Sequence, residues 1–453
     1  MTTEFDTPFA TLGEGVDGPV LVPGDDGFAA EVTPFMLGAT VLPDVVVGVA
    51  NESDVQQAVL FAARNGLHVH IQATGHAAHG TLSGGLLITT RRLDTLVIDP
   101  VARVATIGAG VRWSAVIAAA GEHGLTAITG SSGSVGAIGY TLGGGLGPYA
   151  RSHGFSSDYA LSFRIVTADG ELKTTSTTEN PDLFWALRGG KAGFGVVTEL
   201  TFALVPLAEI YGGALYFAAE HIETVLEGWL GWCATADPDV STSIAIMRFP
   251  PFDEVPPPLR GATALSLRFV YPGDLEEGSR LAEPLRALAP ALIDALGAMP
   301  TTKIALVHND PDQPAPAWVD GVMLTSADTD FASTFLATFG ADAHPPVVSA
   351  ELRHLGHRTA IDVEGGSAVG GRGNAFTLGL VSVLTPDASA QSFDAFWAET
   401  LTSLAPWTSS QTTINFAGHP SPARYSSCWP KDTFERLTSI AAEYDPRGLF
   451  TWK

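Results

Sequence analysis

Cysteine is nearly absent from this chain of 453 residues, which contains only Cys233 and Cys428. Two cysteines are too few for a disulfide framework, and they exclude a zinc site with four cysteine ligands. Basic residues are also scarce, because 24 Lys and Arg stand against 48 Asp and Glu, a formal net charge of −24. A chain this acidic would repel the phosphate backbone of a nucleic acid, so we expect no nucleic-acid partner.

Signals for export or membrane insertion are missing as well. No lysine or arginine precedes Arg64, which argues against a secretory signal, a twin-arginine signal and a transit peptide. The most apolar long stretch, residues 204–219, is interrupted by Glu209 and by Gly212 and Gly213, and it is too short to cross a bilayer. We therefore expect a cytoplasmic protein with no membrane partner.

The composition is that of a folded protein. Hydrophobic residues make up 45% of the chain, which is enough for a sizeable core. At roughly 150 residues per domain, the length corresponds to about three folding units or two large ones.

Regular patterning begins near residue 41 and predicts a strand–helix–strand unit. Residues 45–49 form a valine-rich run that suits a buried strand. Ser53 to Gln56 fit a capping box for the helix that follows, and Gly66 is placed to end it. Residues 67–71 provide the next strand, so the pattern is that of an α/β unit.

Later patterns predict a hairpin and an antiparallel sheet. Asp169 and Gly170 supply the positive φ values of a two-residue turn between strands within residues 161–175. Further strands are predicted at residues 86–90, 95–98, 104–107, 194–204, 264–271, 347–355 and 376–384. Helices are predicted at residues 113–120, 280–296 and 392–405.

Glycine is abundant, with 49 residues, and eight lie in the eighteen positions from Gly130 to Gly147. Ordering so many glycines costs conformational entropy, so the backbone must approach another surface closely. A flat or anionic ligand held by backbone N–H groups would explain this, and a tightly turned loop is the alternative. The interleaved Val135, Ile138 and Leu142 argue against a disordered linker.

A second segment follows the predicted strand at residues 67–71 and reads QATGHAAHG over residues 72–80. It offers small residues, backbone donors and the side chains of His76 and His79. It is not a G-x-G-x-x-G, so a Rossmann dinucleotide site is not supported. A metal site that used these histidines with His354 and His357 would lack a nearby carboxylate, and we expect no metal.

Several segments, read in order, share motifs with a known family. Residues 72–80 are similar to a loop R-S-G-G-H-x-x-x-G, and residues 129–147 to a second glycine-rich loop that ends in a glycine triplet. Residues 152–170, which end in VTADG, are similar to a segment Y-G-L-x-x-D … V-T-A-D-G. The most specific motif lies in residues 182–199, which contain LFWALRGG and FGVVTE.

Two C-terminal pieces, Asn415 with Phe416 and the heptapeptide YDPRGLF at residues 444–450, complete the pattern. The chain thus resembles the vanillyl-alcohol-oxidase type flavoproteins, which have a PCMH-type FAD-binding domain. Within them it is similar to the berberine-bridge-enzyme-like, 6-hydroxy-D-nicotine-oxidase-like branch. The resemblance is strong over about residues 40–210 and weak between residues 210 and 345.

The resemblance implies an α+β fold, with a two-part FAD-binding domain of α/β subdomains and a substrate domain of antiparallel sheet plus helices. The implied boundaries are an N-terminal arm at residues 1–37, the FAD-binding domain at 38–208 and the substrate domain at 209–410. A C-terminal segment at residues 411–453 would return to the FAD-binding domain.

The cofactor implied by the resemblance is FAD, attached at its flavin 8α-methyl group through His76. His79 is a minor alternative attachment site. In doubly linked members a cysteine of the second loop makes another bond, but Ser132 takes that position here, so we expect a single link. The residues expected to bind FAD are Ala73, Thr74, Gly75, His76, Ala77, His79, Gly80, Ser132, Val135, Gly136, Gly139, Tyr140, Gly143, Gly144, Gly145, Gly147, Val197 and Asn415.

The implied activity is transfer of hydride from a substrate C–H beside O or N to the flavin, with O₂ as the acceptor, giving H₂O₂. The substrate is expected to be small: a secondary metabolite, an alcohol or a sugar-like compound. A dehydrogenase with another acceptor and a non-catalytic flavin-binding protein are the alternatives. The protein is expected to be a monomer or a homodimer.

The catalytic residues expected on the substrate side are Tyr140, Glu351 and Arg353. Tyr140 replaces the histidine usual before the glycine triplet and is an acid/base candidate, or else a packing residue under the flavin. Period-two alternation places Ser349, Glu351 and Arg353 on one face of a strand, where they could also be a paired or solvated sheet face. Arg353 replaces a second glutamate of the branch, which disfavours a cationic amine substrate and tolerates a neutral or anionic one. Ser382 lies roughly where some members carry a glutamate base.

Overall fold

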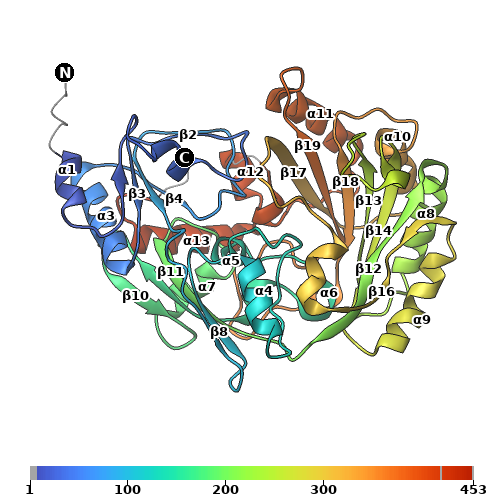
Figure 1. Ribbon diagram of the computed structural model, residues 1–453, viewed down its shortest axis with the longest axis horizontal. Helices are drawn as coiled ribbons and strands as arrows, with labels where there is room; N and C mark the ends of the chain where they lie inside the picture. Colours follow the sequence, from blue (N-terminus) through green and yellow to red (C-terminus); the bar gives the residue numbers. More distant parts are fainter. Residues whose placement is uncertain (1–7, 419–420, 451–453) are drawn as a thin grey trace.

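The computed structural model of the protein describes residues 8–418 and 421–450, so the first seven residues of the predicted N-terminal arm and the last three of the C-terminal segment lie outside it. Figure 1 shows two parts side by side. One part contains the chain up to β11 together with the C-terminal helix α13, and the other contains one large sheet with helices on its outer side. The α+β fold expected from the sequence is confirmed.

The first sheet has the strand order β1-β3-β6-β4 and begins the first part. Strands β3 (Val45–Gly48), β6 (Leu86–Thr89) and β4 (Val69–Gln72) are parallel, and β1 (Val20–Leu21) is antiparallel. Helix α3 (Glu52–Asn65) connects β3 to β4 and ends at Gly66, which has a φ of 66°. The predicted strand–helix–strand unit is therefore present.

The start of α3 differs from the predicted capping box. The N-cap is Asn51, whose side chain accepts a hydrogen bond from the Asp54 backbone N–H at 3.0 Å. Ser53 lies inside the first turn, so its capping role was wrongly predicted. The Asp54 carboxylate instead accepts hydrogen bonds from the backbone N–H groups of Asp17, Gly18 and Ala50, which attach the N-terminal segment to the helix.

The second sheet, of order β10-β9-β11-β8-β7, is antiparallel throughout. Its strands are β10 (Leu172–Thr175), β9 (Ala160–Val166), β11 (Val196–Ala203), β8 (Val104–Gly108) and β7 (Leu96–Asp99). The β9–β10 turn is longer than the predicted two residues. It spans residues 167–171, and Gly170 alone of these has a positive φ. The Asp169 side chain accepts a hydrogen bond from the Glu171 N–H at 3.0 Å.

The third sheet is antiparallel and has the order β15-β12-β14-β13-β18-β19-β17, with β16 also paired to β12. Its strands are β12 (Glu209–Ala218), β13 (Ser241–Arg248), β14 (Thr263–Tyr271), β15 (Ala291–Asp294), β16 (Gly297–Pro300), β17 (Ala317–Leu324), β18 (Ser349–His354) and β19 (Phe376–Val383). The helix predicted at residues 280–296 is instead α9 (Leu275–Arg286) followed by β15, because Pro290 prevents Ala289 from continuing a helix.

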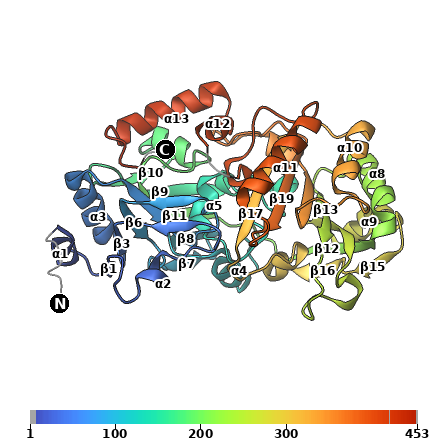
Figure 2. The same ribbon diagram turned by 90° about the horizontal axis from the view of Figure 1, so that it is seen from above.

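Four helices cover one face of the third sheet: α8 (Ile222–Cys233), α9, α10 (Thr329–Phe339) and α11 (Ala390–Ser403) (Figures 1 and 2). Their buried side chains form one core with Ala350 and Leu352 of β18. Because side chains alternate along a strand, Ser349, Glu351 and Arg353 lie on the opposite face. That face is the one turned away from the helices.

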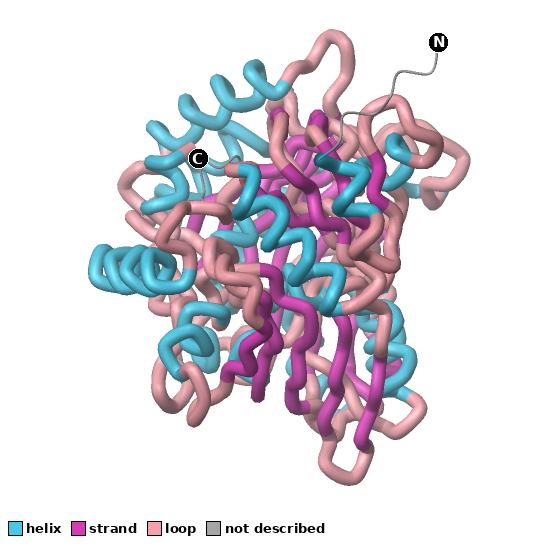
Figure 3. Tube along the Cα trace, turned by 90° about the vertical axis from the view of Figure 1, so that its left-hand side faces the viewer, coloured by secondary structure: helices cyan, strands magenta, loops and turns pink. Residues whose placement is uncertain are grey.

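The remaining helices belong to the first part. They are α1 (Pro8–Gly13), α2 (Phe28–Val32), α4 (Trp113–Gly121), α5 (Ala137–Leu142), α6 (Ala150–His153), α7 (Pro181–Leu187), α12 (Pro422–Ser426) and α13 (Lys431–Tyr444). Helix α13 packs against α7 (Figure 1). Seen from the α1 end, strands run through the middle of the molecule with helices on both sides (Figure 3).

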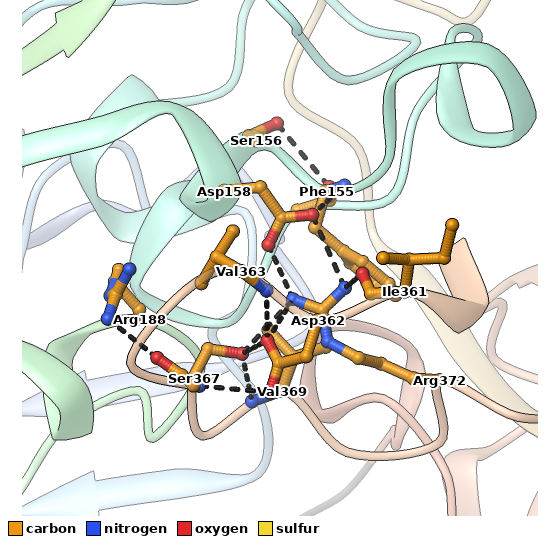
Figure 4. A network of polar contacts seen from close by, with 12 residues as sticks. Phe155, Ser156, Asp158, Arg188, Ile361, Asp362, Val363, Ser367, Val369 and Arg372 are labelled. Carbon is orange, nitrogen blue, oxygen red and sulfur yellow. Dashed lines mark hydrogen bonds and ion pairs between the residues drawn. The ribbon is translucent and has the colours of Figure 1, made fainter. Parts of the chain in front are cut away.

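A buried polar network joins the loop before β19 to the first part (Figure 4). Arg372 forms an ion pair with Asp158, which lies in the turn after α6, and both side chains are only 10% exposed. Arg372 also donates to the Ile361 carbonyl at 3.1 Å and lies 3.2 Å from Asp362. Nearby, Arg188 donates to the Gly366 carbonyl at 2.6 Å. These contacts fix residues 361–372 against the chain that follows the glycine-rich loop.

Cys233 and Cys428 are both buried and both free. Within residues 8–418 and 421–450, no helix combines the length and the apolar character needed to cross a bilayer.

Candidate active site

A cavity of about 590 Å³ lies where the two predicted glycine-rich loops meet. The loop after β4 lines one side, and the loop before α5, with the first turns of that helix, lines another. The short helix η6 (Ile414–Phe416) returns from the C-terminal part of the chain to complete the wall. The cavity brings together these predicted FAD-binding residues: Ala73, Thr74, Gly75, His76, Ala77, His79, Ser132, Val135, Gly136, Gly139, Tyr140 and Asn415.

His76 is held in place from three directions. Its Nδ1 is hydrogen-bonded to Thr74 Oγ1 at 2.9 Å, and its Nε2 to Ser134 Oγ at 3.0 Å. Its ring stacks on Phe35 with 3.6 Å between ring centroids. Burial, together with the charge of Arg112, lowers the pKa of His76 to about 4. The imidazole is therefore neutral at pH 7 and has a lone pair on one ring nitrogen.

Ser132 extends the hydrogen-bonded series that begins at His76 and passes through Ser134. Its Oγ lies 2.8 Å from Ser134 Oγ, and its side chain lines the same cavity as His76. The position that carries a second attaching cysteine in doubly linked relatives is therefore close to His76 in space, but it holds a hydroxyl group. Neither free cysteine lines the cavity.

Tyr140 lines the cavity with its ring, while its hydroxyl is buried. No hydrogen-bond partner for this hydroxyl is found within the described part of the chain. Burial raises the pKa of Tyr140, and the nearby charge of Arg353 opposes that effect. The phenol is thus protonated at neutral pH and is available to donate to, or accept from, a bound molecule.

The glycines of residues 130–147 serve two purposes. Gly136 and Gly139 line the cavity, and a Cβ at Gly139 would meet no protein atom within 4 Å. Gly145 has a φ of 80°, and a Cβ there would press on Tyr140 and Ser156. Gly143, Gly144, Gly145 and Gly147 are not among the cavity-lining residues, because they allow close packing within the protein.

Two other predicted cofactor residues also lie outside the cavity wall. Val197 is buried within β11 in the core of the first part. Gly80 has a φ of 58° and accepts a backbone hydrogen bond from Thr40 at 2.8 Å, so it shapes the end of the loop.

Glu351 and Arg353 belong to a cluster of buried charges on β18. The Glu351 carboxylate accepts hydrogen bonds from Ser243 Oγ at 2.9 Å, Arg268 Nη1 at 2.5 Å and Arg353 Nε at 2.9 Å. Although burial alone would raise the pKa of Glu351, Arg353 and Arg268 lower it well below its usual range. Glu351 is therefore ionised and paired with two guanidinium groups, so it has little capacity to accept a proton. This agrees with the alternative that these residues form a paired face of the sheet.

Arg353 connects this cluster with the cavity. Its guanidinium carbon lies 5.2 Å from the ring centroid of Phe416, which lines the cavity. Its charge also acts on Tyr140 and Asp310, both of which line the cavity. Arg353 thus places a guanidinium group behind the cavity wall, between Glu351 and the lining residues Asp310 and Phe416. Ser382, the other position considered, is buried and donates to the Pro346 carbonyl at 2.9 Å.

Sequence reasoning missed three residues of this region. Lys191 and Asp310 line the cavity, and His308 places its Nε2 3.4 Å from Glu351 Oε1. Burial lowers the pKa of His308, as do the charges of Arg353 and Arg268, so its ring is neutral. Lys191 is the sole charged residue in the glycine-rich run GGKAGFG at residues 189–195, a signal that could have identified it.

Comparison with known proteins defines the class to which this site belongs. Residues 43–176 match the family model described as an FAD binding domain. Residues 43–176 therefore form an FAD-binding domain of this family, and the resemblance of the chain to the berberine-bridge-enzyme-like branch is confirmed.

Particular relatives are an (R)-6-hydroxynicotine oxidase and two oxidases of known structure. The chain is 34% identical over 209 residues to (R)-6-hydroxynicotine oxidase of Paenarthrobacter nicotinovorans, an alignment that covers 46% of this chain and 44% of the relative. The matched region spans about half, or less, of the length of the curated relatives.

The fold is shared with 6-hydroxy-D-nicotine oxidase from Arthrobacter nicotinovorans, at a TM-score of 0.83 and 22% identity over 96% of both chains. It is also shared with glucooligosaccharide oxidase from Acremonium strictum, at a TM-score of 0.84 and 19% identity over 98% of both chains. The description of the latter structure refers to a 6-S-cysteinyl, 8α-N1-histidyl FAD.

The residues of the cavity fit FAD. Its volume lies within the range of small-molecule sites, and Gly139 leaves open a space that any side chain would fill. The loop after β4 contributes small residues, and Lys191 contributes a positive charge for a cofactor that carries phosphates. His76, Tyr140 and Asn415 converge on this space from segments far apart in the sequence.

Proposed function

We propose that this protein is an FAD-dependent oxidoreductase, and more specifically an oxidase that uses O₂ as acceptor. The observation that carries the proposal is the convergence of His76, Tyr140 and Asn415 on one cavity whose wall is backed by the charged face of the third sheet. When bound, FAD accepts hydride from a substrate C–H and passes the electrons on. Oxidases among the relatives favour O₂ over another acceptor.

We further propose that FAD is attached once, through His76. A neutral imidazole on the cavity wall, held by Thr74 and Ser134, supports this assignment. Ser132 lacks the thiol that a second bond requires. The histidyl link in the description of glucooligosaccharide oxidase offers a precedent within the same fold.

The chain's own residues have distinct roles in the proposed reaction. Tyr140 exchanges a proton with the substrate O–H or N–H, because Tyr140 belongs to the cavity wall and its hydroxyl has no hydrogen-bond partner among the described residues. Arg353 lowers the cost of ionising that phenol and is itself oriented by Glu351. Glu351 is thus a positioning residue.

The experiment that tests an oxidase is anaerobic photoreduction of the purified flavoprotein followed by mixing with air-saturated buffer. The proposal predicts reoxidation within seconds to minutes and formation of H₂O₂. A reduced flavin that survives for hours in air would contradict an oxidase and favour a dehydrogenase. A flavin that no alcohol, sugar or amine of a broad panel bleaches anaerobically would favour a non-catalytic flavin-binding protein.

The guanidinium group of Arg353, which lies beside the cavity-lining Phe416, leads us to propose which substrates the site accepts. Benzoate, benzamide and benzylamine have similar shapes and differ in charge, so they serve as matched probes of flavin absorbance. We expect the anion and the neutral amide to bind at least tenfold more tightly than the cation, and Arg353→Met to narrow that difference. Arg280→Met, on the exposed surface of α9, is the matched control. Tighter binding of benzylamine would overturn the assignment.

A further inference from the structure

Lys191 is a charged residue in a part of the cavity that otherwise consists of small and neutral groups. It follows α7 and lines the cavity together with Ala192, Gly139 and Asn415. Its backbone has a φ of 71°, a conformation that side-chain-bearing residues adopt only at a cost. The lysine is therefore held at a position that glycine would occupy more easily, which points to a role for its side chain.

The Lys191 ammonium is held in place by neutral oxygens. Nζ donates to the Gly139 carbonyl at 2.7 Å and to Asn415 Oδ1 at 2.8 Å. Asn415 in turn donates through Nδ2 to the Tyr140 carbonyl at 2.8 Å. The ammonium is thus directed along the glycine-rich loop, and one of its three N–H donors remains for a ligand.

No carboxylate forms an ion pair with Lys191 within residues 8–418 and 421–450, where its partners are neutral oxygens. In the same part of the chain Arg151 and Arg188 are also buried without an ion pair, but neither lines the cavity. Burial alone lowers its pKa to about 8, so the side chain is still largely protonated at pH 7. A buried charge without a counter-ion is costly. In a chain with 48 acidic residues, the missing counter-ion points to a charge that arrives from outside.

We propose that Lys191 is the charge partner of an anionic group of the bound flavin nucleotide. FAD offers two such groups, the pyrophosphate, which is charged in every redox state, and the isoalloxazine ring, which gains negative charge on reduction. Both would supply the missing counter-ion and the acceptor for the third N–H. This inference rests on the proposed cofactor site, but its tests require no substrate and no turnover.

The neutral variants are Lys191→Met, which keeps the length of the side chain, and Lys191→Gly, which also fits the positive φ and so guards against misfolding of the first. Lys191→Arg keeps the charge. All three are made in a His76→Ala chain, so that flavin can dissociate and its binding can be measured. Lys173→Met is the matched control, because Lys173 lies on β10 and pairs with Glu171 at 2.5 Å.

Two measurements distinguish the two sources of negative charge. If Lys191 faces the pyrophosphate, the neutral variants bind FAD at least tenfold more weakly but bind riboflavin as before. If it faces the ring, FAD affinity is kept and the midpoint potential falls by about 30 mV or more, a tenfold loss in preference for the reduced form. In both cases Lys191→Arg should keep most of the FAD affinity or of the midpoint potential that the neutral variants lose.

The proposal is overturned if the neutral variants match the parent within twofold in FAD affinity and in the preference for reduced flavin. It is also overturned if Lys191→Arg behaves like Lys191→Met, since the loss would then come from shape rather than charge. An active oxidase whose neutral variants keep both the FAD affinity and the midpoint potential would refute this role while leaving the proposed function intact.

Discussion

At the scale of single residues, the cavity separates groups by protonation state. His76 is half-buried and neutral, whereas Lys191 is half-buried and still largely charged at pH 7. Tyr140 keeps its proton, and Glu351 is ionised between two guanidinium groups. Each state follows from burial and from the nearest charges, and each suits one role: attachment, charge balance, proton exchange and positioning.

The lowered pKa of His76 predicts how flavin attachment depends on pH. Attachment needs an unprotonated ring nitrogen, and a pKa of about 4 leaves the ring neutral above about pH 5. When apoprotein from a flavin-depleted host is mixed with FAD, the rate of acid-stable flavin formation should change less than about twofold between pH 6 and 8. It should fall steeply only below about pH 5. A rate that halves near pH 6.5, the ordinary value for histidine, would show that the ring is not buried in this way.

At the scale of elements, the network around Arg372 holds the loop before β19 against the turn after α6. The Asp158 carboxylate accepts hydrogen bonds from Arg372 and from the Phe155 backbone N–H, the latter at 2.9 Å. Removing its charge leaves the largely buried Arg372 with Asp362 as its remaining ion-pair partner.

Asp158→Asn should therefore lower the free energy of unfolding by roughly 3 kcal/mol, since the neutral amide keeps the shape but not the charge. Urea denaturation of the two proteins measures the difference. Asp253→Asn removes the exposed ion pair with Arg260 and should cost less than about 1 kcal/mol. Equal losses in both variants would mean that the Asp158 network does not fix this loop.

The sequence predicted elements well where one pattern dominated. The valine-rich run of β3 and the alternation along β18 both gave the correct element and face. It failed where neighbouring residues competed, as at the start of α3, where Asn51 caps in place of Ser53, and after Arg286, where a strand replaces the end of a predicted helix.

The candidate site could be predicted only as far as it is contiguous in the chain. The two loops that contain His76 and Tyr140 are recognisable as continuous motifs, so about half of the residues that line the cavity were identified. Lys191 meets Asn415 across 224 positions, and His308 meets Glu351 through tertiary packing. Such contacts leave no trace in local spacing.

At the scale of the whole molecule, the cavity is assembled from distant parts of the chain. The first two sheets provide the loops that line it, the third sheet backs it with charge, and the C-terminal segment returns with Asn415 and Phe416. This arrangement supports our proposal that residues 38–208 and 209–410 are functional domains joined by a returning C-terminal segment at 411–453. The chain is strongly acidic, but Lys191 and Arg353 place positive charge at the cavity.

The central claim is that this cavity holds FAD and attaches it through His76. The most direct test is to precipitate the purified protein in acid and to measure flavin absorbance in the pellet and the mass of the intact chain. The wild type should keep its yellow colour and exceed the mass of the bare chain by about one FAD. His76→Ala should release the flavin, and His79→Ala, the matched control, should retain it. Flavin that leaves the wild type in acid, or that stays with His76→Ala, would contradict the claim.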